Sequence, residues 1–338
     1  MTDSHSDAEL DETDRRLVHA LQIQPRAPWR LVGDVIGLDP VTAARRWERL
    51  EQAGLAWVHA LARTGRGVGS VSAWVEIRVD GDDIGTLADR LAQDDMVLSL
   101  RRMAGRRDLL ALLAEADLPQ LSMYVGDTLK QVAGVRDTRT HVITDAPILG
   151  MDWRLDALDP TEVAALEAPA ASGTAPERAL DEVDWRIVRV LDRDGRAPVT
   201  QIAAQSEVSV NTVTRRLRSL MAGDQLHLHC DVTRQASGYP VSAVYFASVP
   251  AEHLAETTRA LRTLPAVRVC SVVAGPANLI VDVWLRSIHD VHSLEVYVSE
   301  RLSHFSWRVL DRSVSLRTYK HHGRLLDAAG RAVGPANP

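Results

Sequence analysis

The chain has 338 residues, of which 46% are hydrophobic, so it carries enough apolar material for two to four domains. It contains no run of about 18 apolar residues, and its polar start lacks the apolar stretch of a signal peptide, which predicts a cytoplasmic protein without a membrane partner. The formal net charge of -6 argues against indiscriminate binding to polyanions, and the two cysteines exclude a disulfide scaffold and a cysteine-rich zinc site.

Three helices are predicted at the start of the chain, after a polar segment that we expect to be disordered. The first covers 11–22 and has Asp11 as its N-cap. A second helix at 29–36 and a third at 40–53 follow it, separated by a short turn. Helix, tight turn, helix is the order of a DNA-binding helix-turn-helix, and the helix at 40–53 is its candidate recognition helix.

Strand patterns follow this helical region. A short alternating segment at 55–60 comes first, and then six elements in the order strand, helix, strand, strand, helix, strand. They are predicted at 71–79, 84–93, 97–103, 108–114, 118–131 and 138–143. This is the split β-α-β order of a ferredoxin-like sandwich. The next segment, 146–179, is rich in alanine, proline and acidic residues and is predicted to be a linker with one short helix after Pro160.

The same order of elements returns after the linker. An Ala-rich helical segment at 200–205, a break and a helix at 209–221 form a second helix-turn-helix, and a strand at 226–231 follows. The six elements then recur at 241–249, 251–264, 267–274, 278–285, 287–302 and 309–319. The tail beyond Lys320 has no sustained periodicity, and we expect it to be loose.

The helix at 209–221 has one apolar and one basic side. Val213, Leu217 and Leu220 recur with helical spacing and predict a buried face. The other face carries hydrogen-bond donors and cations with no acidic residue among them, which suits base edges and phosphates. These candidate DNA contacts are Asn211, Thr212, Thr214, Arg215, Arg216 and Arg218. Any amphipathic surface helix also has a polar face, so this pattern alone leaves a purely structural helix open.

The two halves of the chain align without a gap when one is shifted by 170 residues. The shift places Arg26-Ala27-Pro28 on Arg196-Ala197-Pro198 and Ala104-Gly105 on Ala274-Gly275. Because both modules share the offset, the whole unit of helix-turn-helix and ferredoxin-like domain is duplicated. This second copy favours a functional interpretation of the recognition helices.

The first recognition helix has a poorer exposed face than the second. Its candidate DNA contacts are Thr42, Arg45, Arg46 and Arg49. Val41 stands where the second copy has Asn211, and Glu48 and Glu51 dilute the arginines. We therefore predict that the first helix mainly positions the protein on phosphates and the second recognises bases, because an apolar side chain cannot supply bidentate hydrogen bonds. A mainly structural first helix is the alternative.

The segments 180–188 (Leu-Asp-Glu-Val-Asp-Trp-Arg-Ile-Val) and 208–217, with a more divergent version at 10–18, resemble the DNA-binding unit of the leucine-responsive and asparagine-operon regulator (Lrp/AsnC) family. The steps Gly105-Arg106-Arg107-Asp108 and Gly275-Pro276-Ala277-Asn278 resemble its effector-domain signature. The resemblance implies an α+β chain with two winged-type helix-turn-helix domains and two ferredoxin-like (βαββαβ) effector domains in tandem. The expected boundaries are helix-turn-helix domains at 10–60 and 180–232, effector domains at 68–145 and 238–320, and a linker at 146–179.

The resemblance also implies a function. It points to a sequence-specific transcriptional regulator that is not an enzyme, binds double-stranded DNA, needs no cofactor and forms a homo-oligomer or an internal pseudo-dimer. A small-molecule effector, often an amino acid in this family, would bind at the interface of the effector domains, near Gly105, Asp108, Gly275 and Asn278. Asn278 stands where this family usually has an acid.

Plainer interpretations of the effector-domain turns remain open. Each glycine step could be a simple turn between two strands, where glycine permits a close backbone approach. Four arginines lie near the first turn and would either receive an acidic ligand or form a solvated rim paired with nearby acids. They are Arg101, Arg102, Arg106 and Arg107.

The sequence gives weaker support for a metal site or a phosphate-binding loop. His227 and His229 alternate on one face of a strand, but no third metal ligand is evident and Cys230 points to the opposite face, so no metal site is predicted. The glycine-rich 65–69 does not follow the strand that a phosphate-binding loop needs.

Two alternative functions stay open. Sirohaem decarboxylase subunits share this two-module architecture, but the strand at 267–273 lacks the Ser-His-Cys-Tyr type of motif that they carry. The other alternative is an effector-binding protein that has lost DNA binding.

Overall fold

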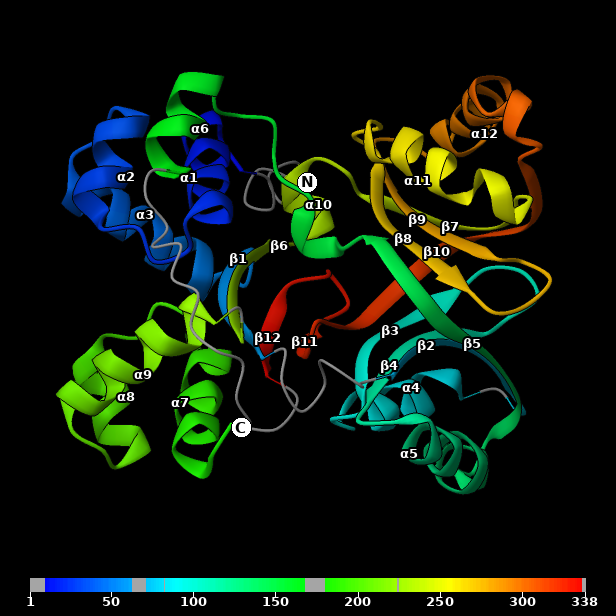
Figure 1. The fold of residues 1–338 in the computed structure, drawn as a ribbon, viewed down its shortest axis with the longest axis horizontal. Helices are drawn as coiled ribbons and strands as arrows, with labels where there is room; N and C mark the ends of the chain where they lie inside the picture. Colours follow the sequence, from blue (N-terminus) through cyan, green and yellow to red (C-terminus); the bar gives the residue numbers. More distant parts are fainter. Residues whose placement is uncertain (1–9, 63–70, 82, 168–179, 224, 336–338) are drawn as a thin grey trace, which may run out of the picture. The chain divides into compact units, whose positions relative to one another are not determined.

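The computed structural model describes residues 10–62, 71–81, 83–167, 180–223 and 225–335 (Figure 1). The expectations for the polar start, for the glycine-rich 65–69 and for the linker beyond Glu167 lie outside these residues. The chain divides into two compact units. Unit 1 combines the chain up to residue 70 with 154–233 and holds both helix-turn-helix motifs, whereas unit 2 combines 71–153 with 234–337 and holds both ferredoxin-like domains.

Unit 1 contains two copies of a three-helix arrangement, each followed by a strand. The first copy consists of α1 (Glu12–Ile23), α2 (Trp29–Ile36), α3 (Pro40–Gln52) and β1 (Ala56–Ala62). The second copy consists of α7 (Glu182–Arg193), α8 (Val199–Ser206), α9 (Val210–Ala222) and β6 (Leu226–Val232). The predicted caps hold these helices: Asp11 accepts a hydrogen bond from the Asp14 N–H, and Ser209 accepts one from the Thr212 N–H.

The two copies in unit 1 are joined through their strands. β1 and β6 form an antiparallel pair in which His59 lies opposite its repeat counterpart His229. Each strand also packs against the first helix of the other copy, since α7 contacts β1 and α1 contacts β6. Ala60 of β1 is accordingly part of the hydrophobic core of the second copy. The two motifs therefore pack together into one folded unit, although they are far apart in the sequence.

The first part of the predicted linker packs on the first helix-turn-helix. The expected short helix is α6 (Pro160–Glu167), and it contacts α1 and α2. The Leu155 N–H donates to Oε1 of Gln22 at 2.8 Å, and the Leu158 N–H donates to Nδ1 of His19 at 3.1 Å. Burial, with the nearby Arg154 charge, lowers the pKa of His19 from 6.5 to about 4, so His19 is neutral at pH 7.

Unit 1 is expected to lose stability as the pH falls from 6.5 towards 4. In this range His19 binds a proton in the unfolded chain but not in the folded one. The free energy of unfolding therefore becomes smaller as the pH is lowered. Thermal melts of the wild type and of His19→Asn between pH 7.5 and 4.5 measure this, because the Asn amide oxygen can accept the same hydrogen bonds without titrating. An identical pH dependence in the variant would contradict the assignment.

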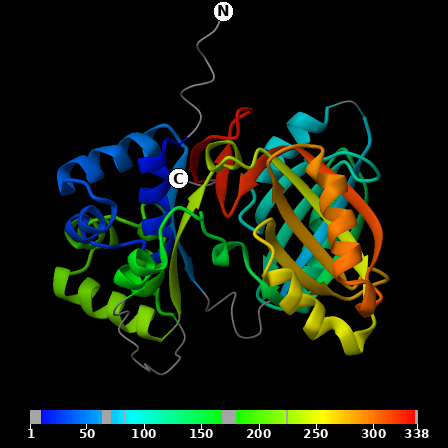
Figure 2. The same ribbon diagram turned by 90° about the horizontal axis from the view of Figure 1, so that it is seen from above.

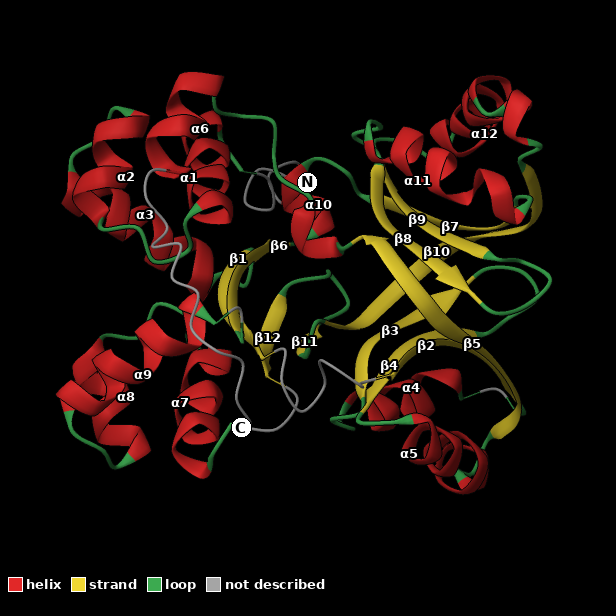
Figure 3. Cartoon of the chain, viewed as in Figure 1, coloured by secondary structure: helices red, strands yellow, loops and turns green. Residues whose placement is uncertain are grey.

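Unit 2 contains the predicted strand, helix, strand, strand, helix, strand order twice. The first copy consists of β2 (Val71–Val79), α4 (Ile84–Ala92), β3 (Val97–Met103), β4 (Leu109–Glu115), α5 (Leu118–Met123) and β5 (Val135–Ile148). The second consists of β7 (Val241–Ser248), α11 (Leu254–Arg262), β8 (Val267–Val273), β9 (Leu279–Leu285), α12 (Asp290–Arg301) and β10 (Arg308–His321). The α+β prediction with two ferredoxin-like domains is confirmed, and α4, α5, α11 and α12 cover the outer faces of the sheets (Figure 3).

The strands of unit 2 close into a barrel, a pseudo-dimer of the two ferredoxin-like folds (Figure 2). The order around it is β10-β3-β4-β2-β5-β8-β9-β7, and β7 pairs again with β10. The last strand of each copy changes partner along its length. β5 pairs first with β2 and, from Ile143, with β8 of the other copy, while β10 pairs first with β7 and, from Ser315, with β3.

Two sequence predictions are wrong in this part of the chain. β5 was predicted to end at 143 but continues to Ile148, because its last residues pair with β8 of the other copy. The tail beyond Lys320 was predicted to be loose but forms β11 (Arg324–Leu326) and β12 (Ala332–Pro335). A tight turn with positive φ at His322 and Gly323 returns the chain, so that β11 pairs with the end of β10.

Candidate functional site

The outward face of α9 carries three polar side chains that are free to contact a ligand. Asn211, Arg215 and Arg218 are exposed, and within the described part of the chain none of them has a hydrogen-bond or ion-pair partner. Their spacing of four and three residues places them on one side of the helix, opposite the buried Val213, Leu217 and Leu220. The two predicted threonines are less free, since Thr214 donates to the Val210 carbonyl at 2.9 Å and Thr212 shares a hydrogen bond with Ser209.

Arg216 has a different environment from the other predicted contacts on α9. Its guanidinium pairs with Asp181 at 2.7 Å and with the buried Asp184 at 3.3 Å, at the start of α7. The Asp184 N–H and Arg216 lower the pKa of Asp181, so the pair is charged at neutral pH. The sequence pattern groups Arg216 with the DNA contacts, whereas the structure commits it to holding the recognition helix against α7.

The first copy repeats this arrangement at the equivalent position. Arg46 pairs with Asp11 at 2.7 Å and with the buried Asp14 at 2.9 Å, and Arg49 also bonds Asp14. Two of the predicted contacts of α3 therefore pair with α1, although the Arg49 side chain is still 58% exposed. Thr42 and Arg45 stay exposed, and Arg45 has no ion-pair partner among the residues that the structure describes.

Reciprocal arginine–carbonyl hydrogen bonds between the two copies were not predicted from the sequence. Arg26 donates to the carbonyls of Gly195 at 2.7 Å and Ala197 at 2.8 Å, and Arg196 donates to the equivalent carbonyls of Pro25 and Ala27. Burial, together with the charge of Arg26, lowers the pKa of Arg196 to about 10. The repeated Arg-Ala-Pro motif was visible in the sequence, but its role depends on the contact between the copies.

The two glycine turns of unit 2 have matching hydrogen bonds. Oδ2 of Asp108 accepts from the Val79 N–H at 2.9 Å, and Oδ1 of Asn278 accepts from the equivalent Val249 N–H at 3.0 Å. The amide of Asn278 also donates to the Val249 carbonyl at 2.7 Å. Gly105 and Gly275 have φ of 101° and 151° and are exposed. These side chains stabilise the turns, which favours the plain-turn interpretation, and their contact with an effector stays a prediction.

Two of the four arginines near the first turn lie inside the barrel. Arg107 donates to Glu76 at 2.7 Å and to Asp311 at 2.6 Å, bonds Ser313 and lies 4.1 Å from the ring centroid of Phe246. Burial alone would raise the pKa of Glu76, but hydrogen bonds from His141 and Arg107 lower it to about 2. Arg107 therefore links the two ferredoxin-like copies through a buried charge network.

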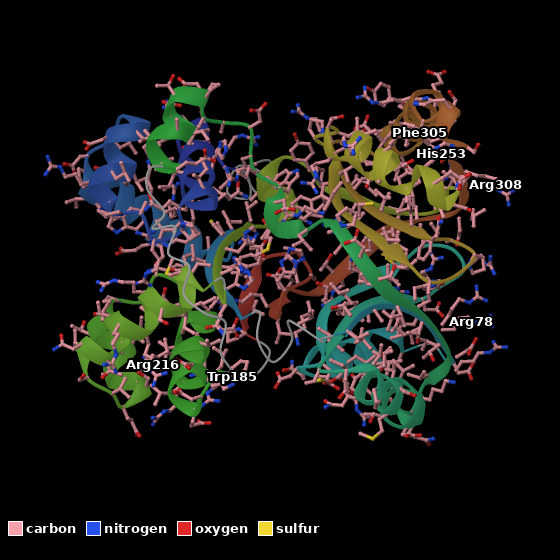
Figure 4. All side chains as sticks on the ribbon, in the orientation of Figure 1. Arg78, Trp185, Arg216, His253, Phe305 and Arg308 are labelled. Atoms are coloured by element: carbon pink, nitrogen blue, oxygen red, sulfur yellow. The ribbon has the colours of Figure 1, made fainter. Side chains whose placement is uncertain are left out.

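Of the other three arginines near the first turn, one is buried and two are exposed. Arg101 donates to Asp282 at 2.8 Å and to Ser242 at 3.2 Å, again joining the copies. Arg102 and Arg106 are exposed. Arg78 of β2 and Arg308 of β10 lie at the same end of the barrel as the two glycine turns (Figure 4). Both of these arginines are exposed.

The histidines that were weighed as metal ligands lie on the strand pair of unit 1. His229 contacts Asp231 at 3.3 Å between Nε2 and Oδ1, and His59 of β1 contacts the other oxygen of Asp231 at 3.2 Å. Burial raises the pKa of Cys230 well above its usual value, so its thiol is protonated at neutral pH. His59 and Asp231 were not singled out from the sequence, because they come together only when β1 and β6 pair.

Comparisons with known proteins match both modules. The AsnC-type helix-turn-helix domain matches residues 10–51 and 180–221, and the Lrp/AsnC ligand binding domain matches residues 72–152. An HTH-type transcriptional regulator FL11 of Pyrococcus abyssi is 24% identical over 135 residues, 40% of this chain and 89% of the relative. The Bkd operon transcriptional regulator of Pseudomonas aeruginosa is 27% identical over 132 residues, 38% of this chain and 86% of the relative. Each relative is thus matched over most of its own length by less than half of this chain.

A solved structure is similar over nearly the whole chain. The siroheme decarboxylase NirDL aligns with 92% of this chain and 93% of its own, with a TM-score of 0.60 and 15% identity. This similarity shows a shared fold. Within the described residues no helix is both long and apolar enough to cross a membrane.

The fold and the matched domains define a DNA-binding, helix-turn-helix protein of transcription regulation. The chain belongs to the Lrp/AsnC family, in a form that carries two copies of the family's architecture in tandem.

Proposed function

We propose that this protein is a sequence-specific transcriptional regulator that binds double-stranded DNA with α3 and α9 as an internal pseudo-dimer. The observation that carries the proposal is the set of Asn211, Arg215 and Arg218, which are exposed and have no partner among the described residues. They lie on a recognition helix held by an ion pair to the buried Asp184. Asparagine suits adenine and arginine suits guanine in the major groove, whereas lone arginines also bind phosphates. The joined β1 and β6 support placing two recognition helices in successive major grooves, about 34 Å apart in a duplex.

Base recognition by α9 can be tested by alanine substitution. Asn211→Ala or Arg215→Ala is expected to relax the base preference by about 1 to 3 kcal/mol for each lost bidentate contact. Arg45→Ala is expected to weaken binding to all sequences alike, because a phosphate contact carries no sequence information. Competition binding of the full chain to matched duplexes, with one base pair changed at a time, measures both effects. Equal loss of preference at both helices would contradict the division of roles.

We further propose that a small molecule bound by the ferredoxin-like barrel controls DNA binding. The glycine turns and the exposed Arg78, Arg106 and Arg308 at one end of the barrel support a site there. Such control requires the molecule to bind two arrangements of the recognition helices with different affinity. A screen of amino acids and small carboxylates for a change in DNA affinity would test this proposal.

The enzyme alternative rests on the fold shared with the siroheme decarboxylase. A shared fold does not carry a shared activity, and the strand β8 (Val-Arg-Val-Cys-Ser-Val-Val) lacks the motif expected of such an enzyme. A haem-type absorption band of the purified protein would favour the alternative over the regulator.

A further inference from the structure

The two recognition helices have the same framework but different outward faces. Under the repeat offset of 170 residues, Arg46 corresponds to Arg216, and each pairs with two aspartates at the start of the first helix of its own copy. Since these ion pairs are equivalent, α3 and α9 are fixed in the same way within their motifs. Any difference in recognition therefore resides in the side chains that point outward.

The outward side chains differ in charge at equivalent positions. Glu48 of α3 stands where α9 has Arg218, and both are exposed. Arg45 and Arg215 are matched, so at these two positions α3 carries one positive and one negative charge while α9 carries two positive charges. A carboxylate next to a duplex repels phosphates, whereas a second guanidinium neutralises one more of them.

The outward faces also differ in hydrogen-bonding capacity. Val41 is 66% exposed at the position where α9 has the exposed Asn211. An asparagine can form two hydrogen bonds with an adenine edge, but valine can only contact a thymine methyl group. Ala44 likewise replaces Thr214. Both differences give α3 fewer side-chain hydrogen-bonding groups for base edges than α9 has.

We propose that this chain recognises a non-palindromic duplex and binds it in one orientation. α9 occupies a half-site with strong base preference, and α3 occupies a second half-site with little base preference and fewer phosphate contacts. A homodimer presents two identical helices and selects a palindrome, because operator symmetry mirrors protein symmetry. The duplicated chain has no such constraint. This inference rests on the proposed DNA-binding function and specifies the kind of duplex that it takes.

The test is selection of duplexes from a random-sequence library by the full chain. The enriched sequences are expected to show base preference concentrated in one half-site. Val41→Asn combined with Glu48→Arg transfers the outward face of α9 to α3, and is expected to select a nearly palindromic sequence. The same variant is expected to steepen the salt dependence of binding, with a slope larger by about 1 for each phosphate newly neutralised.

The reciprocal variant tests the strong half-site. Asn211→Val combined with Arg218→Glu is expected to remove the base preference and to lower affinity for the selected duplex by about 5- to 150-fold, the range of a lost bidentate contact. All four positions are exposed, so the variants are expected to fold, which circular dichroism checks. Arg90→Ala, an exposed change on α4 of unit 2, is the control and is expected to leave selection unchanged.

The outcomes separate this inference from the proposed function. Enrichment of palindromes with equal preference in both half-sites by the wild type would overturn the inference and leave the regulator intact. Unchanged selection by the Val41→Asn, Glu48→Arg variant would also overturn it. Retention of no duplex at all would overturn both the inference and the proposed function.

Discussion

Replacement of Arg107 by methionine is expected to destabilise the barrel by about 3 to 5 kcal/mol. The change removes the cation that pairs with Glu76 and Asp311 inside the barrel, and loss of one partner leaves the other charges buried without compensation. Methionine keeps much of the side-chain volume next to Phe246, so the effect is mainly electrostatic. Hydrogen exchange of the β2 and β10 amides in the full chain measures the free energy of opening.

The neighbouring Arg106 supplies the control for this prediction. It is exposed, so Arg106→Met is expected to change the opening free energy by less than about 0.5 kcal/mol. Neutralising the acids with Glu76→Gln and Asp311→Asn in the Arg107→Met background is expected to restore part of the lost stability. Equal protection of β2 and β10 in Arg107→Met and the wild type would show that the network contributes nothing.

Replacement of Gly195 by alanine is expected to destabilise unit 1 by about 2 to 4 kcal/mol and to abolish DNA binding by the pseudo-dimer. A Cβ at this position would lie 2.5 Å from Cγ1 of Val58 and 2.9 Å from the backbone N of His59, so β1 must move. Overpacking costs about 1 to 3 kcal/mol. Displacing β1 also weakens the hydrogen bond from the Gly195 N–H to the Val58 carbonyl.

Gly85 is the matched control for Gly195→Ala. It lies within α4, and the nearest atom to an added Cβ is 3.6 Å away, so Gly85→Ala is expected to be neutral or stabilising by up to about 1 kcal/mol. Thermal melts combined with DNA binding by the full chain compare the two variants. Wild-type DNA affinity in Gly195→Ala would mean that the contact between the copies does not position the recognition helices.

Local signals predicted much of the fold. The caps at Asp11 and Ser209 and the helical spacing of apolar residues located the recognition helices within one or two residues, because these features act over a single turn. The order of the six strands and helices in each ferredoxin-like copy was also predicted, since each element has its own pattern of apolar and polar residues. The continuation of β5 to Ile148 was not predicted, because it depends on pairing with a strand more than 100 residues away.

The candidate site was predicted less completely than the fold. Exposed arginines and paired arginines look the same in a sequence, so Arg216 was grouped with Arg215 although its partner Asp184 lies 32 residues earlier. The same limit applies to Arg107, whose partner Asp311 belongs to the other copy. The repeat offset contained a usable signal: aspartates at 11, 14, 181 and 184 recur together with Arg46 and Arg216, and their joint repetition indicates an internal contact.

The exchange of β5 and β10 between the two sheets bears on how the protein responds to its own abundance. In a regulator built from separate polypeptides, the paired effector domains dissociate on dilution, and the active fraction falls with copy number. Here both halves of the barrel belong to one polypeptide, and the last strand of each half pairs with a strand of the other. The pairing of the two effector domains within one chain is therefore independent of the concentration of the protein.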